Sequence, residues 1–526
     1  MSHYFLISFL IVSLFISWLI IKHSRAFVRL VKSIFISSRK DIVANPDVMK
    51  MVSRHPHLFG FLKQRLNRKS FYGLPLTLLS LVLFYALLLF VGVIQDIITS
   101  DPLALTDVRI ANLLYAFRND EALSFFTWVT TLGSAPIIIT SSIAFSIVLW
   151  IWKKHKYLLP FWLTLAGAQL FSSLGKVVIR RPRPELAFYN EHTFSFPSGH
   201  AALSVVFYGF IAYFLFRSIK KWEKKVAVLC AALFIISLIG FSRIYIGVHF
   251  LSDVWGGYLL GAIWLVIGIT VSEIINRRNP VVSGELHWSV RETKAISIGL
   301  LTIGLLIYVV FAMYYRPLIN NERVTEQIVV TNDIIKTLDE ENLSRYSETL
   351  GGNNQEPLNI IITAKDDNEL ISVMRQAGWS LADPVTLPSL VAMAKAALYK
   401  ENYSTAPMTP SFWNTRVHDF GFEKPTEAMS ARERHHFRIW RTSIIMPNGY
   451  HVYVSTGSLD AGIYWFVAHR IAPDIDTERE LLFNDLNSTG MVLNSDKIQL
   501  VAPTIGNNFI GNQFFTDGKT YLIALK

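Results

Sequence analysis

The sequence contains little cysteine and lacks several patterns that mark other classes of protein. Its single cysteine, Cys230, lies in an apolar run, so one chain has neither a disulfide framework nor a cysteine-based zinc site. Scarce cysteine is compatible with an oxidising compartment. There is no internal repeat and no long low-complexity tract. No basic stretch is interleaved with aromatic residues or motifs that read bases, so we expect no nucleic-acid partner.

Hydrophobic residues, in contrast, are abundant. They make up 52% of the 526 residues and the mean hydropathy is positive, which is too apolar for an ordinary soluble protein. Residues 1–315 contain 31 Lys and Arg against 14 Asp and Glu, a net charge of +17, whereas residues 316–526 contain 19 against 25, a net charge of −6. This asymmetry predicts a basic membrane part, suited to anionic lipid headgroups, and an acidic domain in other surroundings.

Eight segments are long and apolar enough to cross a bilayer, which takes about 20 residues at about 1.5 Å each. They lie at about residues 3–22, 73–95, 125–152, 157–176, 200–217, 226–242, 251–275 and 295–315. The first has no basic stretch before it and no clear small-residue cleavage site after it. We therefore interpret it as a retained anchor, with a signal peptide as the alternative.

Basic connecting segments predict the orientation of these spans. If the spans alternate, residues 23–72, 153–156, 217–225 and 277–278 fall on one side, which is then cytoplasmic. The N-terminus and residues 316–526 lie on the opposite face, which is the periplasmic face of a bacterial inner membrane. Within the first connection, residues 24–38 have apolar and basic positions at helical spacing, which predicts an amphipathic helix at the interface.

Three short motifs in one apolar region carry residues that suit phosphate chemistry. In chain order they are Lys176…Arg183-Pro184, Pro197-Ser198-Gly199-His200 and Ser242-Arg243…His249…Asp253. A phosphoryl group in transfer spreads negative charge over its oxygens, and fixed positive charge stabilises it. Arg183 and Arg243 can each bind two oxygens through their forked donors, while Lys176 adds a point charge.

The remaining motif residues predict a nucleophile and an acid. Gly199 lets the backbone approach an anion at a helix N-terminus, and the Ser198 hydroxyl adds a donor. His249 and Asp253 are four residues apart and can share one helix face, where a carboxylate bonded to one ring nitrogen leaves the other free to attack phosphorus. We predict a phosphohistidine on His249, with His200 as general acid and then as base.

These motifs, as spaced, closely resemble those of the type 2 phosphatidic acid phosphatase superfamily. The resemblance covers roughly residues 73–275. It implies a six-helix membrane core and a phosphatase that needs no metal and no cofactor, with an extracytoplasmic catalytic face. Arg180 and Arg181 are extra cations, which we interpret as loop anchors at the interface; contact with a second phosphate is the alternative. Soluble vanadate-dependent haloperoxidases share the site architecture, but eight membrane spans argue against them.

The acidic tail has the pattern of a soluble α+β domain. Its β-rich runs at 358–363 and 450–456 alternate with helical stretches at 367–377 and 477–487. Its sequence resembles the LssY-type C-terminal domain over residues 357–486, on Pro357-Leu358-Asn359, Gly378-Trp379, Arg434-His435-His436, Arg438-Ile439-Trp440 and Asp474-Ile475-Asp476-Thr477-Glu478-Arg479-Glu480. The resemblance implies no activity.

The tail also contains residues that could suggest a metal site, namely His435, His436, Asp460, His469, Asp474 and Asp476. Adjacent histidines on a strand point to opposite faces, so only one of the pair would reach a shared ion. We therefore favour a binding or structural role and predict no metal.

Together these patterns predict an all-α polytopic membrane bundle, a six-helix phosphatase core with an N-terminal and a C-terminal transmembrane helix, followed by a soluble α+β domain. The expected domains are residues 1–72, an anchor and basic amphipathic cytoplasmic segment; 73–275, the core; 276–315, a cytoplasmic loop and the last span; and 316–526, the extracytoplasmic LssY-like domain.

The expected function is hydrolysis of a membrane lipid phosphate or diphosphate. Candidate substrates are phosphatidic acid, phosphatidylglycerol phosphate, undecaprenyl diphosphate and the lipid A phosphates. A lipid phosphotransferase, in which a second acceptor replaces water, would use the same residues. A lipid-binding or transport component, whose acidic tail recruits a protein partner, is the alternative outside the enzymes.

Overall fold

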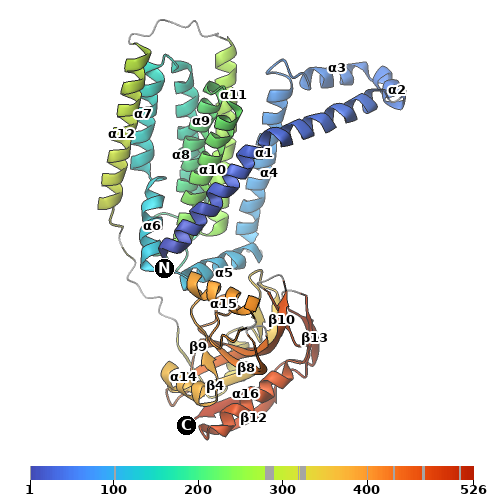
Figure 1. Ribbon diagram of the computed structural model, residues 1–526, viewed down its shortest axis with the longest axis vertical. Helices are drawn as coiled ribbons and strands as arrows, with labels where there is room; N and C mark the ends of the chain where they lie inside the picture. The colour runs from blue at the N-terminus through green and yellow to red at the C-terminus, as the bar shows by residue number, and fades with distance from the viewer. Residues whose placement is uncertain are drawn as a thin grey trace. The chain divides into compact units, whose positions relative to one another are not determined.

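The computed structural model describes residues 2–44, 46–99, 102–278, 289–317, 319, 327–399, 401–430, 433–464, 468–508 and 511–526. The chain divides into two compact units (Figure 1). The membrane unit contains residues 6–99 and 118–320. The C-terminal unit contains residues 321–526 together with residues 1–5 and 100–117.

The membrane unit is built from helices. Their bounds are α1 (Ser2–Ala44), α2 (Pro46–Arg54), α3 (Pro56–Arg65), α4 (Leu74–Thr99), α6 (Asp120–Thr131), α7 (Ala135–Ile151), the 3₁₀ turn η1 (His155–Tyr157), α8 (Leu158–Ile179), α9 (Gly199–Ser218), α10 (Trp222–Tyr245), α11 (Leu251–Arg278) and α12 (Val290–Tyr314).

Six helices of the described residues, α4 and α8 to α12, are each long and apolar enough to cross a membrane. The pair α6 and α7 makes a seventh candidate if it is taken as one span. These seven coincide with seven of the eight predicted spans, and the predicted all-α membrane bundle is confirmed. The first predicted span, residues 3–22, lies in α1 and falls partly on residues whose side chains are not described.

The predicted single span at 125–152 is broken in the structure, because α6 and α7 meet at a bend of 43°. The N–H groups of Leu132, Gly133 and Ser134 bond to carbonyls three residues back instead of four, which tightens the chain at this point. Pro136, in the first turn of α7, lacks an N–H and begins the new helix. The break lies beside a motif residue, since a Cβ on Gly133 would be 3.3 Å from His200 Cδ2.

Helix α9 is the most buried helix of the unit and packs against α8, α10 and α11. The close contact with α11 depends on small residues. A Cβ added to Gly257 would lie 2.5 Å from the carbonyl oxygen of Ser198, and one added to Gly261 would lie 2.7 Å from that of Ala202. Small residues four apart let membrane helices approach this closely. They bring the start of α11 against the start of α9, where the second and third motifs lie.

The C-terminal unit combines strands and helices. Its helices are α5 (Pro102–Ala116), α13 (Ile334–Glu340), α14 (Asp367–Gln376), α15 (Leu387–Tyr399) and α16 (Asp476–Ser488). Its strands are β1 (Val329–Val330), β2 (Tyr346–Glu348), β3 (Asn354–Pro357), β4 (Ile360–Ala364), β5 (Ser380–Leu381), β6 (Phe412–Trp413), β7 (Arg416–Val417), β8 (Phe420–Ser430), β9 (Glu433–Ile445), β10 (His451–Tyr464), β11 (Ala468–Ile471), β12 (Val492–Gln499), β13 (Thr504–Asn507), β14 (Gln513–Thr516) and β15 (Lys519–Leu525).

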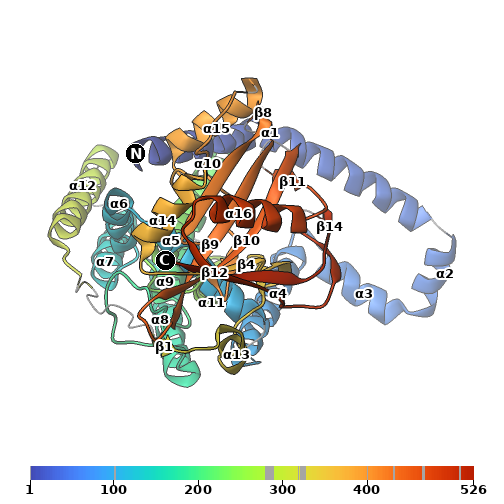
Figure 2. The same ribbon diagram turned by 90° about the horizontal axis from the view of Figure 1, so that it is seen from below.

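The main sheet, whose strands can be followed in Figure 2, has the order β12-β15-β4-β10-β9-β8-β5. Hydrophobic clusters lie on both of its faces. Side chains alternate along β4, so Ile360 and Ile362 join one cluster while Ile361 joins the other. Helices α14 and α16 cover the first face, and α13 packs on the second. The predicted soluble α+β domain is therefore confirmed, including helices close to 367–377 and 477–487.

Helix α5, although it lies between α4 and α6 in the chain, belongs to the C-terminal unit. Arg109 on α5 donates through Nη2 to Glu348 Oε2 at 2.7 Å, and both side chains are almost fully buried. Asn112 Nδ2 donates to the carbonyl oxygen of Thr415 at 3.0 Å. A buried ion pair is costly to break, so it ties this short helix to the strands that follow the last span.

Candidate active site

All eight predicted site residues come from one end of the α8–α11 group. Lys176 lies in the last turn of α8 and Arg243 in the last turn of α10. Ser198 is the N-cap of α9, whose first residues are Gly199 and His200. His249 lies just before α11, Asp253 in its first turn, and Arg183 in the connection between α8 and α9. Because these four helices alternate in direction, two helix ends and two helix starts lie at the same end (Figure 1).

The connection from Arg180 to Ser198 folds back over this end. Ser195 donates its N–H to the carbonyl oxygen of Arg181 at 2.9 Å, and its Oγ donates to that of Pro182 at 2.8 Å. Arg183 donates through Nε to the carbonyl oxygen of Thr193 at 2.7 Å and through Nη1 to that of Val248 at 2.6 Å. These bonds hold the Arg183 guanidinium between its own loop and the start of the third motif.

The three predicted cations lie within electrostatic range of one another. Lys176 and Arg183 interact electrostatically with each other and with Arg243. The carboxylates of Glu191 and Asp253 also act on both residues and favour their charged forms. Arg243 is fully buried and donates through Nη1 to Tyr189 Oη and to Thr130 Oγ1, the latter at 3.0 Å. A set of positive charges of this kind, one buried and two partly buried, is suited to hold a tetrahedral anion.

The histidine of the third motif faces these cations. His249 Nε2 lies 3.4 Å from Arg183 Nη1, and the imidazole is almost completely buried. Burial first, then the charges of Arg243 and Arg183, lower the pKa of His249 well below its ordinary value of 6.5. The ring is therefore neutral at neutral pH, which leaves a ring nitrogen able to attack.

The carboxylate of Asp253 lies behind this ring, but its hydrogen bonds differ from the prediction. Oδ2 lies 3.5 Å from His249 Nδ1, which has no hydrogen-bond partner among the described residues. Oδ2 accepts the N–H of Phe250 at 2.9 Å, and Oδ1 accepts from Arg181 Nη1 at 2.7 Å. The helix start and Arg181 thus fix the carboxylate, and a small approach of the ring would complete the predicted bond.

The second motif provides donors at the start of α9. The first N–H groups of a helix have no carbonyl partner within the helix, and they favour an anion. The Oγ of Ser198 is buried and has no hydrogen-bond partner among the described residues. A Cβ on Gly199 would come no closer than 3.4 Å to the protein, and Gly199 has no positive φ, so the protein itself does not require glycine there. A ligand that approaches the backbone would explain the residue.

His200 lies in the first turn of α9 and is half-buried. The charges of Arg243, Glu191, Lys176 and Arg183 all act on its ring. His200 therefore shares its surroundings with His249, which it also influences electrostatically. The prediction that both histidines belong to one site agrees with this arrangement.

Two residues of the site were not recognised in the sequence. Arg181 contacts Ser252 Oγ at 2.6 Å as well as Asp253, so it is buried in the site and is not an interfacial anchor. Glu191 was not singled out at all, yet its carboxylate bonds both Arg183 and Arg243. The connection between the two spans contains two acidic residues, Glu185 and Glu191, close to a basic motif, and this was the available signal.

Comparison with known proteins agrees with the motifs. Residues 157–277 match the family model of the PAP2 superfamily, and residues 340–520 match that of the LssY C-terminus. The curated phosphatidylglycerophosphatase B of Bacillus subtilis (strain 168) is 29% identical over 196 residues, which is 36% of this chain and 96% of the relative. The chain therefore contains a PAP2 superfamily domain at residues 157–277. The predicted resemblances to this superfamily and to the LssY-type C-terminal domain are confirmed, over residues 157–277 and 340–520 respectively.

Two solved structures are similar to this PAP2 protein. One is the transmembrane PAP2-type phosphatidylglycerolphosphate phosphatase of Bacillus subtilis, with 30% identity and a TM-score of 0.33 over 38% of this chain and 98% of that chain. The other is LpxE of Aquifex aeolicus, with 28% identity and a TM-score of 0.26 over 30% of this chain and 92% of that chain.

The candidate metal ligands in the tail do not gather among the described residues. His435 Nδ1 pairs with Glu478 at 2.9 Å, whereas His436 lies near Asp460 and Ser458. Asp474 accepts the N–H of Asp476 at the start of α16. His469 lies outside the residues whose side chains are described. Within the described part of the chain, no three metal-binding side chains come together.

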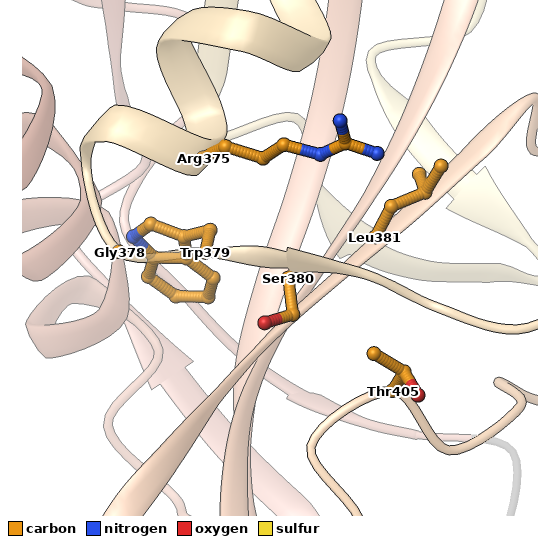
Figure 3. A pocket seen from close by; sticks show the side chains of 6 residues that line it. All are labelled: Arg375, Gly378, Trp379, Ser380, Leu381 and Thr405. Atoms are coloured by element: carbon orange, nitrogen blue, oxygen red, sulfur yellow. The ribbon is translucent and has the colours of Figure 1, made fainter.

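A pocket of about 350 Å³ lies beside the short edge strand β5 of the C-terminal unit (Figure 3). Figure 3 shows the side chains of Arg375, Trp379 and Thr405 around it, and Arg375 supplies its one charged group. The lining contains no carboxylate, histidine or cysteine.

Proposed function

We propose that this PAP2 protein hydrolyses a membrane lipid phosphate or diphosphate through a phosphohistidine, without a metal ion. The observation that carries the proposal is the position of His249 Nε2, 3.4 Å from a guanidinium nitrogen of Arg183. A phosphoryl group held by Arg183 and Arg243 would present its phosphorus to that nitrogen. Membership of the PAP2 superfamily supports a lipid phosphatase.

In the first step His249 Nε2 forms a bond to phosphorus and the bond from phosphorus to the lipid oxygen breaks. The leaving oxygen takes a proton from His200. In the second step His200 takes a proton from water, the water oxygen attacks phosphorus, and the bond to Nε2 breaks to release inorganic phosphate. Asp253 stabilises the positive charge that develops on the His249 ring, and Lys176, Arg183, Ser198, Gly199 and Arg243 bind the phosphoryl oxygens.

The proposed substrates are lipid phosphates and diphosphates that can reach an extracytoplasmic site in an inner membrane. Phosphatidylglycerol phosphate is the candidate suggested by the similar Bacillus subtilis protein, whose printed name is phosphatidylglycerophosphatase B. Phosphatidic acid, undecaprenyl diphosphate and the lipid A phosphates are the other candidates.

The deciding experiment is release of phosphate by the purified full-length chain from a panel of these lipids in detergent. We expect turnover of at least one lipid and none in the His249→Asn variant. Transfer of phosphate to a second lipid, without release, would indicate a phosphotransferase. Binding without either reaction would contradict an enzyme and favour a lipid-binding component.

A further inference from the structure

Glu191 occupies the place that the proposed function assigns to the substrate phosphate. Its Oε2 lies 2.6 Å from Arg183 Nη2, and its Oε1 bonds Arg243 Nη2. One carboxylate therefore bridges the two guanidinium groups that would bind phosphoryl oxygens. Burial alone would raise the pKa of this carboxyl, but Arg243 and Arg183 outweigh it and hold the pKa at about 2. The Glu191 carboxylate is thus ionised at neutral pH.

Arg243 and Glu191 differ in how much of their side chains is exposed to solvent. The side chain of Arg243 is completely buried, whereas that of Glu191 keeps 24% of its surface exposed. Glu191 lies in the connection between α8 and α9, outside any helix or strand. The guanidinium of Arg243 is therefore held in place, whereas the carboxylate of Glu191 can move away from it.

We propose that Glu191 is a specificity-determining residue, an internal anion that only a doubly charged phosphate displaces from Arg183 and Arg243. This proposal rests on the proposed function, because it concerns which lipids enter that same site. A phosphomonoester or terminal diphosphate has a second pKa of about 6 and carries close to two negative charges at neutral pH. A phosphodiester carries one.

The charge difference decides which lipids can compete. When a singly charged phosphodiester replaces the singly charged carboxylate, the two arginines gain no negative charge in exchange. When a dianion replaces it, they gain one, in a buried site where Coulomb interactions are strong. Most lipids of a membrane are phosphodiesters and surround the site at high concentration. An internal carboxylate would keep them from occupying the cations without excluding the substrate.

The first test compares Glu191→Gln with the matched control Glu185→Gln, which removes an exposed carboxylate from the same connection. Phosphate release from short-chain phosphatidic acid in micelles is measured while phosphatidylglycerol, a phosphodiester anion, is added at constant total lipid. We expect E191Q to lower the mole fraction of phosphatidylglycerol for half-inhibition about tenfold or more, as loss of an electrostatic repulsion would. The wild type and E185Q should respond alike.

The second test does not depend on turnover. Thermal stabilisation of the purified chain is measured above the second pKa of inorganic phosphate, where this ion is mainly a dianion, and compared with stabilisation by dimethyl phosphate, a monoanion. The wild type should be stabilised by phosphate only, and E191Q by both. If E191Q binds both anions more weakly than the wild type, or discriminates as well as the wild type does, the proposal is wrong and Glu191 merely positions the arginines.

The two tests also separate this inference from the proposed function. If the wild type releases no phosphate from any lipid, the proposed function fails, and the stabilisation experiment still decides the role of Glu191. If E191Q does not fold, Glu191→Asp replaces it. The shorter side chain places its carboxylate less well between the two arginines, so phosphatidylglycerol should half-inhibit E191D at a lower mole fraction than it half-inhibits the wild type; an unchanged value would overturn the proposal.

Discussion

Arg181 Nη1 donates to Asp253 Oδ1 at 2.7 Å, and this carboxylate lies behind the ring of His249. Arg181 also lies over the ring of Phe250, with 4.4 Å between the guanidinium carbon and the ring centroid. It therefore fixes the residue that is proposed to orient the nucleophile, without itself belonging to the phosphate-binding set. We regard it as a positioning residue.

This relationship predicts the effect of Arg181→Gln. A displaced carboxylate would leave the His249 ring poorly oriented, and small misplacements of reacting groups cost on the order of 100-fold in rate. We expect kcat to fall by about that factor while KM changes little, because the phosphate-binding cations are intact. Arg180→Gln, which removes an exposed neighbouring guanidinium, is the control and should be near wild type. A large change in KM with an unchanged kcat would contradict the positioning role.

A second prediction separates the two histidines. His249→Asn should abolish turnover of every substrate, since it removes the proposed nucleophile. His200→Asn should slow a lipid monophosphate by about 100-fold or more, the usual contribution of a general acid, but an aryl phosphate much less. A nitrophenolate leaves as a stable anion and hardly needs the proton.

The measurement is single turnover, which isolates the phosphorylation step. Steady-state rates could mask the difference, because His200 is also proposed to activate water in the second step. Equal losses on the two substrates in single turnover would show that another group is the acid.

The third prediction concerns metal ions. Lys176, Arg183 and Arg243 supply the positive charge that a metal would otherwise provide. Activity should survive thorough chelation, and vanadate should inhibit by mimicking five-coordinate phosphorus. Phosphate release is measured after dialysis against a chelator, and then again with vanadate added. Loss of activity that magnesium restores would refute the metal-independent mechanism.

The fourth prediction concerns orientation. The basic connections predict that residues 23–72 and 217–225 lie in the cytoplasm and that the C-terminal domain lies outside. In a Cys230→Ala background, a cysteine at the exposed position Asn353 should react with a membrane-impermeant reagent in intact spheroplasts. A cysteine at the exposed position Lys221 should react only after lysis. The reverse pattern would place the catalytic end in the cytoplasm.

The fifth prediction concerns the link between α5 and the C-terminal unit. Breaking the buried pair of Arg109 and Glu348 leaves an uncompensated charge, which costs about 3–5 kcal/mol of stability. Arg109→Gln and Glu348→Gln should each lower the thermal midpoint clearly. The double exchange R109E/E348R should recover part of the loss. Single variants that melt like the wild type would show that the pair does not stabilise this unit.

Local patterns predicted much of this protein. Apolar length identified the spans, because a helix in lipid needs a fixed number of apolar residues. The β-rich runs at 358–363 and 450–456 and the helical stretches at 367–377 and 477–487 predicted the α+β tail. The three motifs named the residues of the site, because phosphate chemistry calls for those side chains at those spacings. The break in the span at Gly133 was not predicted, because apolar composition does not indicate where a helix bends.

The sequence by itself determined which residues carry charge, which segments are apolar and which chemistry the motifs suit. Only the tertiary structure decided which groups meet. It set Arg181 against Asp253, left His249 Nδ1 short of a hydrogen bond, and placed the Glu191 carboxylate between Arg183 and Arg243. The physical reason is that each contact joins segments on different helices or connections. The distance between these segments depends on how closely α8 to α11 pack against one another. The spacing of residues along the chain does not specify this packing.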